Sequence, residues 1–318
     1  MDKIRLFTTD KNNISRQTLD NNFDYVGSTF DVLKHNTRNT FKNTNTNIAI
    51  DKYGILVKTN PTNYIKDNNL IQIDRKELID FKQQFETDLN IDTNNFQLTG
   101  FDFNVNISTQ YDPKAYLNTI RTLPKYKQII HPYIEGISFD NNCKRFTFYD
   151  KIRQFKAENN FIPTEYANSN ILRLEMAVKG KMKQTKNLSS IDTLKDLTTP
   201  NNYISAINEF ENIYKKIHKQ PTLKFKTMTL PNPNIINSTD FALLFYLNEI
   251  GIDTYFNQLQ QERDMNIISY RQMKLRRDKA IELWNLYLKQ NQEDTIDLLQ
   301  ELNTKVSDRI TELKALAA

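Results

Sequence analysis

The sequence predicts an α+β protein built on an antiparallel sheet, with a β-rich N-terminal extension and a helical C-terminal region. Between residues 101 and 178, stretches with strand-like alternation and stretches with helical spacing follow in the order strand, helix, strand, strand, helix, strand. This order is typical of the ferredoxin-like, or split βαβ, arrangement. In that arrangement the first and third strands lie side by side in the centre, and helices cover one face of the sheet.

Turn and capping signals predict the N-terminal strands and the helix that follows them. Residues 47–59 favour two short strands around a turn near Gly54, and residues 70–73 favour a further strand. Asp74 followed by Glu77 forms a capping box, which begins a helix. The apolar positions of that helix recur at helical spacing, at Leu78, Phe81, Phe85 and Leu89.

The central elements follow from alternation and from proline. Residues 101–107 alternate strictly between apolar and polar side chains, as a half-buried strand does. Asp112 and Pro113 favour the start of a helix that Pro124 ends. The apolar stripe expected for this helix is Tyr116, Leu117, Ile120 and Leu123. Three further strands are predicted, at residues 134–139, 145–151 and 171–178.

The C-terminal part is predicted to be mostly helical. We expect a linker at residues 181–202 and a helix at residues 203–218, and helices from about residue 239 to the end. These helices either pack on themselves or form a dimerisation pair. The expected division of the chain is a β-rich extension (1–69), a catalytic domain (70–182), a linker and helix (183–238) and a helical region (239–318).

Composition limits the classes of function. One cysteine, Cys143, and three histidines exclude an internal disulfide framework and argue against a zinc cluster. No apolar run reaches the roughly 18 residues that span a membrane, and the N-terminus has no signal-like apolar core. We therefore expect a soluble cytoplasmic protein. Residues 144–186 hold ten Lys or Arg and four Asp or Glu, which indicates a polyanion partner or a solvated basic face.

Alternation places a reactive set of side chains on the predicted open face of the sheet. This set is Asp102, Asn104, Tyr149, Lys151, Arg173 and Glu175. Two carboxylates suit a hard cation such as Mg²⁺ or Mn²⁺, which polarises a phosphate oxygen. A neighbouring tyrosine can attack phosphorus and form a covalent phosphotyrosine. The alternative is a polar face whose charged groups pair with one another.

Three motifs in this region resemble a known family. They are FDFNVN (residues 101–106), KRFTFYDK (residues 144–151) and ILRLEMAVKG (residues 171–180). Each is similar to a strand motif of rolling-circle replication initiators, namely LD-apolar-A-apolar-D, RFIRIYNK and WRVEIELK. The closest likeness is to the Rep_trans family of small plasmids, with a looser likeness to the filamentous-phage gene II proteins.

The resemblance implies a catalytic domain of the HUH-endonuclease type and a role for each matched residue. Tyr149 falls at the position of the nicking tyrosine, and Lys151 at the lysine that follows it. Asp102 and Glu175 fall at acidic positions beside a Mg²⁺ or Mn²⁺ ion, whereas Asn106 replaces a second acid. DNA contacts are expected from the basic residues of this region, which are Lys144, Arg145, Arg153, Arg173, Lys179, Lys181 and Lys183.

The expected function is therefore replication initiation for a phage or plasmid in a bacterial host cell. The chain would nick one DNA strand, stay attached to the 5′ phosphate and later rejoin the strand. Single-stranded or melted origin DNA is the expected partner, and a helicase and a second copy of the chain are further candidate partners. Two alternatives stay open: a non-catalytic nucleic-acid-binding protein on the same fold, and a phage structural or interaction protein.

Overall fold

A computed structural model of the chain describes residues 1–31, 35–66, 69–180, 182–219, 223–225, 237–290 and 295–317. These residues divide into two compact units. Unit 1 comprises residues 1–114, 122–218 and 305–318, and unit 2 comprises residues 115–121 and 219–304. The predicted segments 1–69 and 70–182 both contribute strands to one sheet of unit 1.

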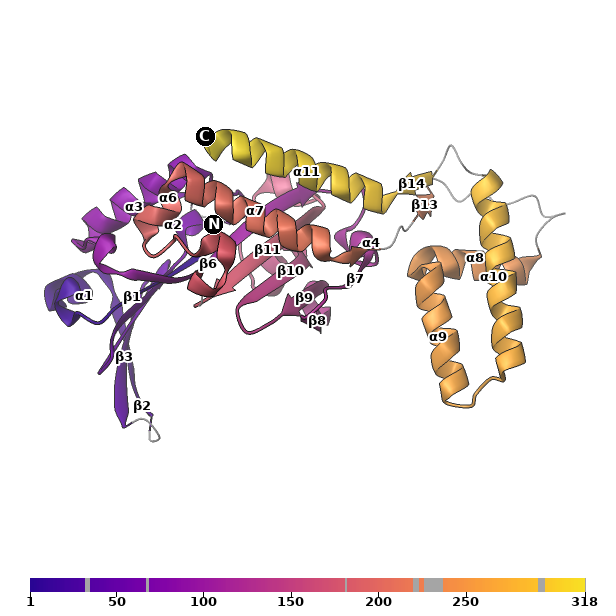
Figure 1. Ribbon diagram of the computed structural model, residues 1–318, viewed down its shortest axis with the longest axis horizontal. Coiled ribbons are helices and arrows are strands. Elements are labelled where there is room, and N and C mark those ends of the chain that lie inside the picture. Colours follow the sequence, from indigo (N-terminus) through magenta and orange to yellow (C-terminus); the bar gives the residue numbers. More distant parts are fainter. Residues whose placement is uncertain are drawn as a thin grey trace. The chain divides into compact units, whose positions relative to one another are not determined.

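A ten-stranded antiparallel sheet is the framework of unit 1, in the order β2-β3-β4-β5-β1-β6-β11-β10-β9-β8 (Figure 1). The strands of the first half are β1 (Lys3–Thr8), β2 (Asp24–Asp31), β3 (Asn36–Lys42), β4 (Thr46–Asp51) and β5 (Gly54–Thr59). Those of the second half are β6 (Gln97–Ser108), β8 (Lys127–His131), β9 (Gly136–Asp140), β10 (Lys144–Asp150) and β11 (Ile171–Lys179). The short strands elsewhere are β7 (Ile120–Thr122), β12 (His218–Lys219), β13 (Leu223–Phe225) and β14 (Thr295–Asp297).

The two halves of the sheet have the same strand order. In the N-terminal half, β1 pairs with β5, from which β4, β3 and β2 lead outward. In the C-terminal half, β6 pairs with β11, from which β10, β9 and β8 lead outward. The halves join where β1 runs antiparallel to β6. We call them the N-terminal half-sheet and the C-terminal half-sheet.

The predicted ferredoxin-like strand order is wrong. The first predicted strand corresponds to β6 and the third to β10, and β11 lies between them. Strands that are consecutive in sequence tend to pair in space, and β8, β9, β10 and β11 do so as one meander. The remaining edge of β6 pairs with β1. The coarser prediction, an α+β protein with an antiparallel sheet and a helical C-terminal region, is confirmed.

The helices agree with the sequence where a cap or a long apolar stripe marks them. They are α1 (Arg16–Asn22), α2 (Pro61–Lys66), α3 (Arg75–Leu89), α4 (Pro113–Leu117), α5 (Lys151–Ala157), α6 (Leu194–Thr198), α7 (Pro200–Lys216), α8 (Ser238–Ile250), α9 (Ile252–Asp264), α10 (Tyr270–Gln290) and α11 (Leu298–Ala317). The capping box of Asp74 and Glu77 is confirmed at the start of α3.

Three local predictions are wrong. Residues 70–73, which were expected to form a strand, contain none, and the Leu70 carbonyl accepts a hydrogen bond from the Asn106 side chain instead. The helix that begins at Pro113 ends at Leu117, and β7 follows where the helix was expected to continue. Thr119 and Ile120 are β-branched, which lowers helix propensity, and the Thr119 hydroxyl donates to the carbonyl of Tyr116. The expected linker at residues 181–202 contains α6, which begins with a capping box of Thr193 and Asp196.

The apolar positions of the strands face α7, as the alternation predicts. The Phe210 ring of α7 lies 5.4 Å from that of Phe103 in β6 and 4.9 Å from that of Phe146 in β10, measured between ring centroids. All three side chains are fully buried. The intervening polar residues therefore lie on the opposite face of the C-terminal half-sheet.

Helices α8, α9 and α10 make up most of unit 2. Leu244, Leu283 and Tyr287 form one buried cluster, and a second cluster consists of Leu259, Ile268 and Met273. In the part of the chain that is described, none of the helices has both the length and the apolar character that crossing a lipid bilayer requires.

Candidate catalytic site and basic surface

Strand register brings the predicted catalytic tyrosine to the predicted glutamate. Tyr149 in β10 lies directly opposite Arg173 in β11, so Glu175 is its diagonal neighbour on the same face. The Tyr149 hydroxyl donates a hydrogen bond to Oε2 of Glu175 over 3.2 Å. Alternation placed both residues on one face, and in the structure their side chains are in contact.

The face that carries these residues is covered, whereas the sequence indicated an open face. Tyr149 is 6% exposed and Arg173 is fully buried. The cover comes from the start of the chain and from the segment after α2. The Arg173 guanidinium donates to the Asp2 carboxylate and to the carbonyl of Asn69, and Asn106 Nδ2 donates to the carbonyl of Leu70 over 2.6 Å. Sequence alternation identified the face but could not show what packs on it.

Arg173 is the centre of the buried charges. Its Nε also donates to Asn106 Oδ1 over 2.6 Å, and the Tyr149 side chain is a further hydrogen-bond partner. Burial alone would raise the pKa of Asp2, but the nearby Arg173 and Lys151 charges hold that pKa below its ordinary value. A buried ion pair of this kind is costly to break because either partner alone is an uncompensated charge.

Burial shifts the proton affinities of the catalytic candidates. It raises the pKa of Glu175 to about 7, with smaller contributions from the Asp102 and Asp2 carboxylates. Burial and the Glu175 charge raise the pKa of Tyr149 well above 10. Burial and the Arg173 charge lower the pKa of Lys151 well below its ordinary value. Burial therefore favours the uncharged form of all three groups.

Lys151 lies beside Tyr149 but is held by a different partner. Its Nζ donates to Gln154 Oε1 over 2.7 Å and lies 5.8 Å from the centroid of the Tyr149 ring. The expectation that Lys151 favours the phenolate rests on the resemblance. The partners that the structure shows for the phenol oxygen are Glu175 and Arg173.

The predicted metal ligands lie in one electrostatic cluster. Asp102 Oδ1 accepts a hydrogen bond from Arg5 Nη2 over 2.9 Å, and burial raises the pKa of Asp102. Asp102 and Asp2 both raise the pKa of Glu175, so the three carboxylates repel one another. A divalent cation such as Mg²⁺ or Mn²⁺ would relieve that repulsion, although the ligand oxygens of the three carboxylates do not all lie within 4.8 Å of one another.

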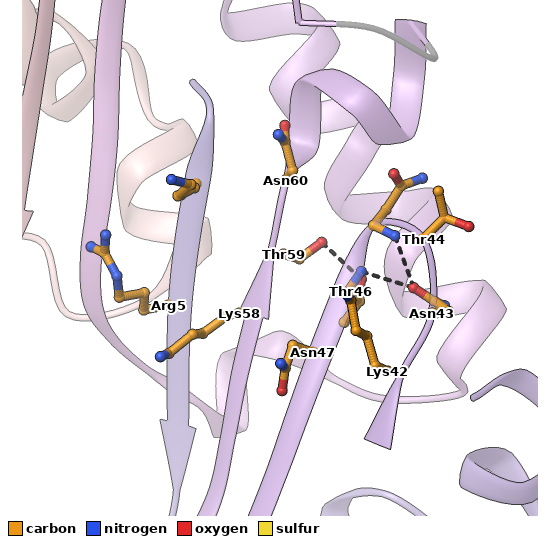
Figure 2. Close-up of a pocket in the computed structure, with 11 residues that line it drawn as sticks. Arg5, Lys42, Asn43, Thr44, Thr46, Asn47, Lys58, Thr59 and Asn60 are labelled. Atoms are coloured by element: carbon orange, nitrogen blue, oxygen red, sulfur yellow. Dashed lines mark hydrogen bonds between the residues drawn. The ribbon is translucent and has the colours of Figure 1, made fainter. Parts of the chain in front are cut away.

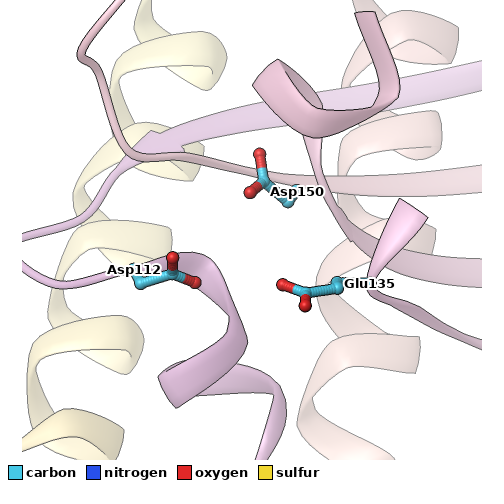
Figure 3. Close-up of side chains that lie close together, drawn as sticks. All are labelled: Asp112, Glu135 and Asp150. Carbon is cyan, nitrogen blue, oxygen red and sulfur yellow. The ribbon is translucent and has the colours of Figure 1, made fainter. Parts of the chain in front are cut away.

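A second acidic cluster lies at the start of α5. Carboxylate oxygens of Asp112, Glu135 and Asp150 lie within 4.8 Å of one another (Figure 3). Among the described residues, no other group of three or more His, Cys, Asp or Glu side chains brings its ligand atoms this close together. Each carboxylate already has a partner. Asp112 accepts from the Lys114 amide, Asp150 accepts from the Arg153 amide, and Glu135 pairs with the Lys114 and Arg153 side chains.

The predicted DNA-binding residues are largely paired with acids. Lys144 pairs with Glu209, Arg145 and Lys179 pair with Asp140, Arg153 pairs with Glu135, and Lys183 pairs with Asp192. Arg173 is buried against Asp2, and Lys181 lies outside the described residues. The basic character of residues 144–186 is thus offset by acids from elsewhere in the chain, and the DNA contacts stay a prediction.

A cavity of about 550 Å³ adjoins the buried cluster. It is lined mainly by amides and aromatic side chains, together with one lysine and one glutamate: Lys3, Asn60, Asn63, Asn69, Gln154, Phe155, Glu158, Asn160, Phe161 and Pro163. Gln154 is also the partner of Lys151. The cavity therefore borders the residues that surround Tyr149.

A second, basic cavity of about 220 Å³ lies on the N-terminal half-sheet. Figure 2 shows Lys42, Asn47, Lys58 and Arg5 on four neighbouring strands. Sequence reasoning missed this surface, although Lys58 is a polar position in an alternating strand that the sequence did predict. The signal became visible only when β1 and β5 were seen to pair.

No family model matches the chain, and no curated protein is significantly similar to it.

Proposed function

We propose that this chain is a rolling-circle replication initiator of the HUH-endonuclease type that nicks and rejoins single-stranded DNA through Tyr149. The observation that carries the proposal is the hydrogen bond from the Tyr149 hydroxyl to Glu175. The three motifs that resemble the initiator family contribute three adjacent strands, β6, β11 and β10. Strand order does not support the proposal, since it differs from the ferredoxin-like order.

Glu175 is suited to take the proton of the attacking hydroxyl. In the proposed step Tyr149 Oη forms a bond to phosphorus, and the bond from phosphorus to the 3′ oxygen of the preceding nucleotide breaks. Glu175 accepts the phenol proton and returns it to the departing 3′ oxygen. The products are a 5′-phosphotyrosine and a free 3′-hydroxyl. The reverse step rejoins the strand.

Asp102 and Glu175 would hold the Mg²⁺ or Mn²⁺ ion that the resemblance implies. Such an ion supplies polarisation of a phosphate oxygen and offsets charge as the phosphate is attacked. Because Asp102 is bonded to Arg5, ion binding at this site competes with that ion pair.

Access to Tyr149 requires the cover to separate. With 6% of its surface exposed, the tyrosine cannot contact a phosphodiester while Asp2 and Asn69 remain on Arg173. Asn69 also lines the neighbouring cavity, which is the entry route that this proposal gives to DNA. The buried arrangement is thus a resting state of the proposed enzyme.

Covalent capture tests the proposal. We expect incubation with a pool of single-stranded DNA and Mn²⁺ to give a protein–DNA adduct that mass spectrometry maps to Tyr149. Tyr149→Phe should abolish the adduct, whereas Tyr133→Phe, which alters a tyrosine that is 69% exposed, should retain it. An adduct on another residue, or none on any DNA in the pool, contradicts the assignment.

The burial of Tyr149 favours a second candidate, a non-catalytic protein that binds nucleic acid on the same sheet. Its raised pKa keeps the phenol protonated at neutral pH. Under this alternative the wild-type chain binds single-stranded DNA but forms no adduct, and Tyr149→Phe binds equally well.

A further inference from the structure

A row of cations crosses the strands of the N-terminal half-sheet. Lys42 lies opposite Asn47, Asn47 opposite Lys58, and Lys58 opposite Arg5. Directly opposite residues in an antiparallel sheet lie on the same face, so these side chains share one face, as Figure 2 shows. Lys3 lies two residues before Arg5 on that same face. The row ends at Asp24, which lies opposite Lys42.

No described residue that lines the basic cavity is acidic, although Asp24 lies opposite Lys42 at the end of the row. Apart from the four cations, the described residues that line the basic cavity are amides and hydroxyls: Asn43, Thr44, Asn45, Thr46, Asn47, Thr59 and Asn60. Lys3, Lys42 and Lys58 are exposed, and none of the three forms an ion pair with another described residue. Arg5 is the exception, since it pairs with Asp102.

This arrangement has an energetic cost in the chain alone. Like charges directly opposite each other in a sheet are destabilising, and Lys58 and Arg5 are such a pair. The residues predicted to bind DNA show the reverse, since acids pair with nearly all of them. Unpaired cations grouped on one surface are the electrostatic footprint of a polyanion ligand.

The row leads toward the proposed catalytic cluster. Lys3 and Asn60 line both the basic cavity and the larger cavity that borders Gln154 and Lys151. We propose that the row Lys3, Arg5, Lys42 and Lys58 binds the phosphate backbone of single-stranded DNA that runs from the N-terminal half-sheet toward Tyr149. The grouped cations by themselves indicate a polyanion ligand, and the choice of DNA as that polyanion rests on the proposed function.

The salt dependence of binding tests this surface. The probe is a fluorescein-labelled single-stranded DNA pool in EDTA, read by fluorescence anisotropy, so that no cleavage occurs. For single strands, each phosphate contact contributes about 0.7 to the slope of log K against log salt. Lys42→Gln with Lys58→Gln should therefore reduce the slope by about 1.4 and weaken binding about 25-fold at 0.1 M salt.

Matched controls keep the test specific. Lys195→Gln with Lys216→Gln removes the same charge from α6 and α7, where both lysines are exposed, and should leave the slope unchanged. Thermal unfolding of both double variants checks the fold. The proposal is overturned if the two double variants lose equal DNA affinity or if the Lys42 and Lys58 double variant keeps the wild-type salt slope. It is also overturned if the wild-type chain does not bind the DNA.

The adduct assay separates this inference from the proposed function. If the Tyr149 adduct forms while the row variant binds DNA like the wild type, the basic row is wrong and the nicking function stands. If the row variant loses binding and the wild type forms no adduct, the row is right and the chain binds DNA without cutting it.

Discussion

The two half-sheets share a strand order but differ in what happens to their polar faces. In the C-terminal half-sheet, Arg173 and Tyr149 are buried and partnered. In the N-terminal half-sheet, Lys42 and Lys58 are exposed, and no ion pair is formed by either within the described ranges. The difference lies in the cover, since Asp2 and Asn69 bond to Arg173 of one half. Topology fixes which residues share a face, and packing on that face decides whether their charges are available to a ligand.

The largest expected effect comes from breaking the buried pair. Arg173→Met leaves the Asp2 carboxylate buried without its main cation, so we expect a loss of about 3–5 kcal/mol in the free energy of unfolding, measured by urea denaturation. Arg145→Met, which removes a half-exposed partner of Asp140, should cost under about 1 kcal/mol. Equal losses in the two variants would show that the C-terminal half-sheet is not held by its buried charges.

A smaller loss is expected where the two half-sheets meet. Gly100 lies opposite Arg5, and a Cβ there would lie 2.6 Å from the Val178 carbonyl oxygen and 2.7 Å from Arg5 Nη1. Gly100→Val should therefore displace Arg5 from Asp102 and destabilise the fold by about 1–3 kcal/mol. Calorimetric melting measures the loss. Gly27→Val is the control, because a Cβ at Gly27 has no neighbour within 4 Å, although its positive φ of 146° adds local strain. A larger loss at Gly27 than at Gly100 would contradict close packing at the junction.

One carboxylate in each half-sheet should make stability depend on pH, and the two dependences should have opposite directions. The folded-state pKa of Glu175 is raised from 4.5 to about 7, so its contribution to stability is fully present below about pH 4.5 and is lost as the pH rises through 7. Glu175→Gln should therefore be more stable than the wild type at pH 8, by on the order of 1–3 kcal/mol, and equal to it near pH 4.5.

Asp51 of the N-terminal half-sheet provides the opposite case. Burial acts to raise its pKa, but hydrogen bonds from the Tyr53 amide and from Arg38 hold the pKa below its ordinary value. Its contribution is present at neutral pH and is lost as the pH falls below its ordinary pKa. Asp51→Asn should thus be less stable than the wild type at pH 7, with the difference disappearing in acid. Urea titrations from pH 3 to 8 measure both variants. If both substitutions stabilise the protein at neutral pH and above, or both destabilise it, the expected difference between the two half-sheets is wrong.

The sequence predicted the features that depend on near neighbours in the chain. Alternation placed Phe103 and Phe146 toward the helices, and the capping box at Asp74 began α3 as expected. Period-two alternation assigns each side chain to a face, so it also brought Tyr149 and Glu175 to the same face.

The features that the sequence could not show depend on distant partners. Arg173 is a polar strand position that alternation turns outward, yet it is buried because Asp2, 171 residues away, pairs with it. Lys144 is likewise offset by Glu209, which is 65 residues away. Alternation also carries no information on strand order, so the insertion of β11 between β6 and β10 was not foreseen.

The smallest expected change in stability comes from a single exposed lysine of the N-terminal half-sheet. Lys58 lies directly opposite Arg5, so Lys58→Gln removes a like-charge repulsion and should stabilise the fold by about 0.2–1 kcal/mol. The gain should shrink as salt screens the pair, whereas Lys195→Gln on α6 should show no gain. Melting temperatures at 20 mM and 500 mM salt measure both. A Lys58→Gln variant that is more stable yet binds DNA more weakly would show that the lysine is kept for a ligand rather than for folding; a less stable variant would mean that it supports the sheet.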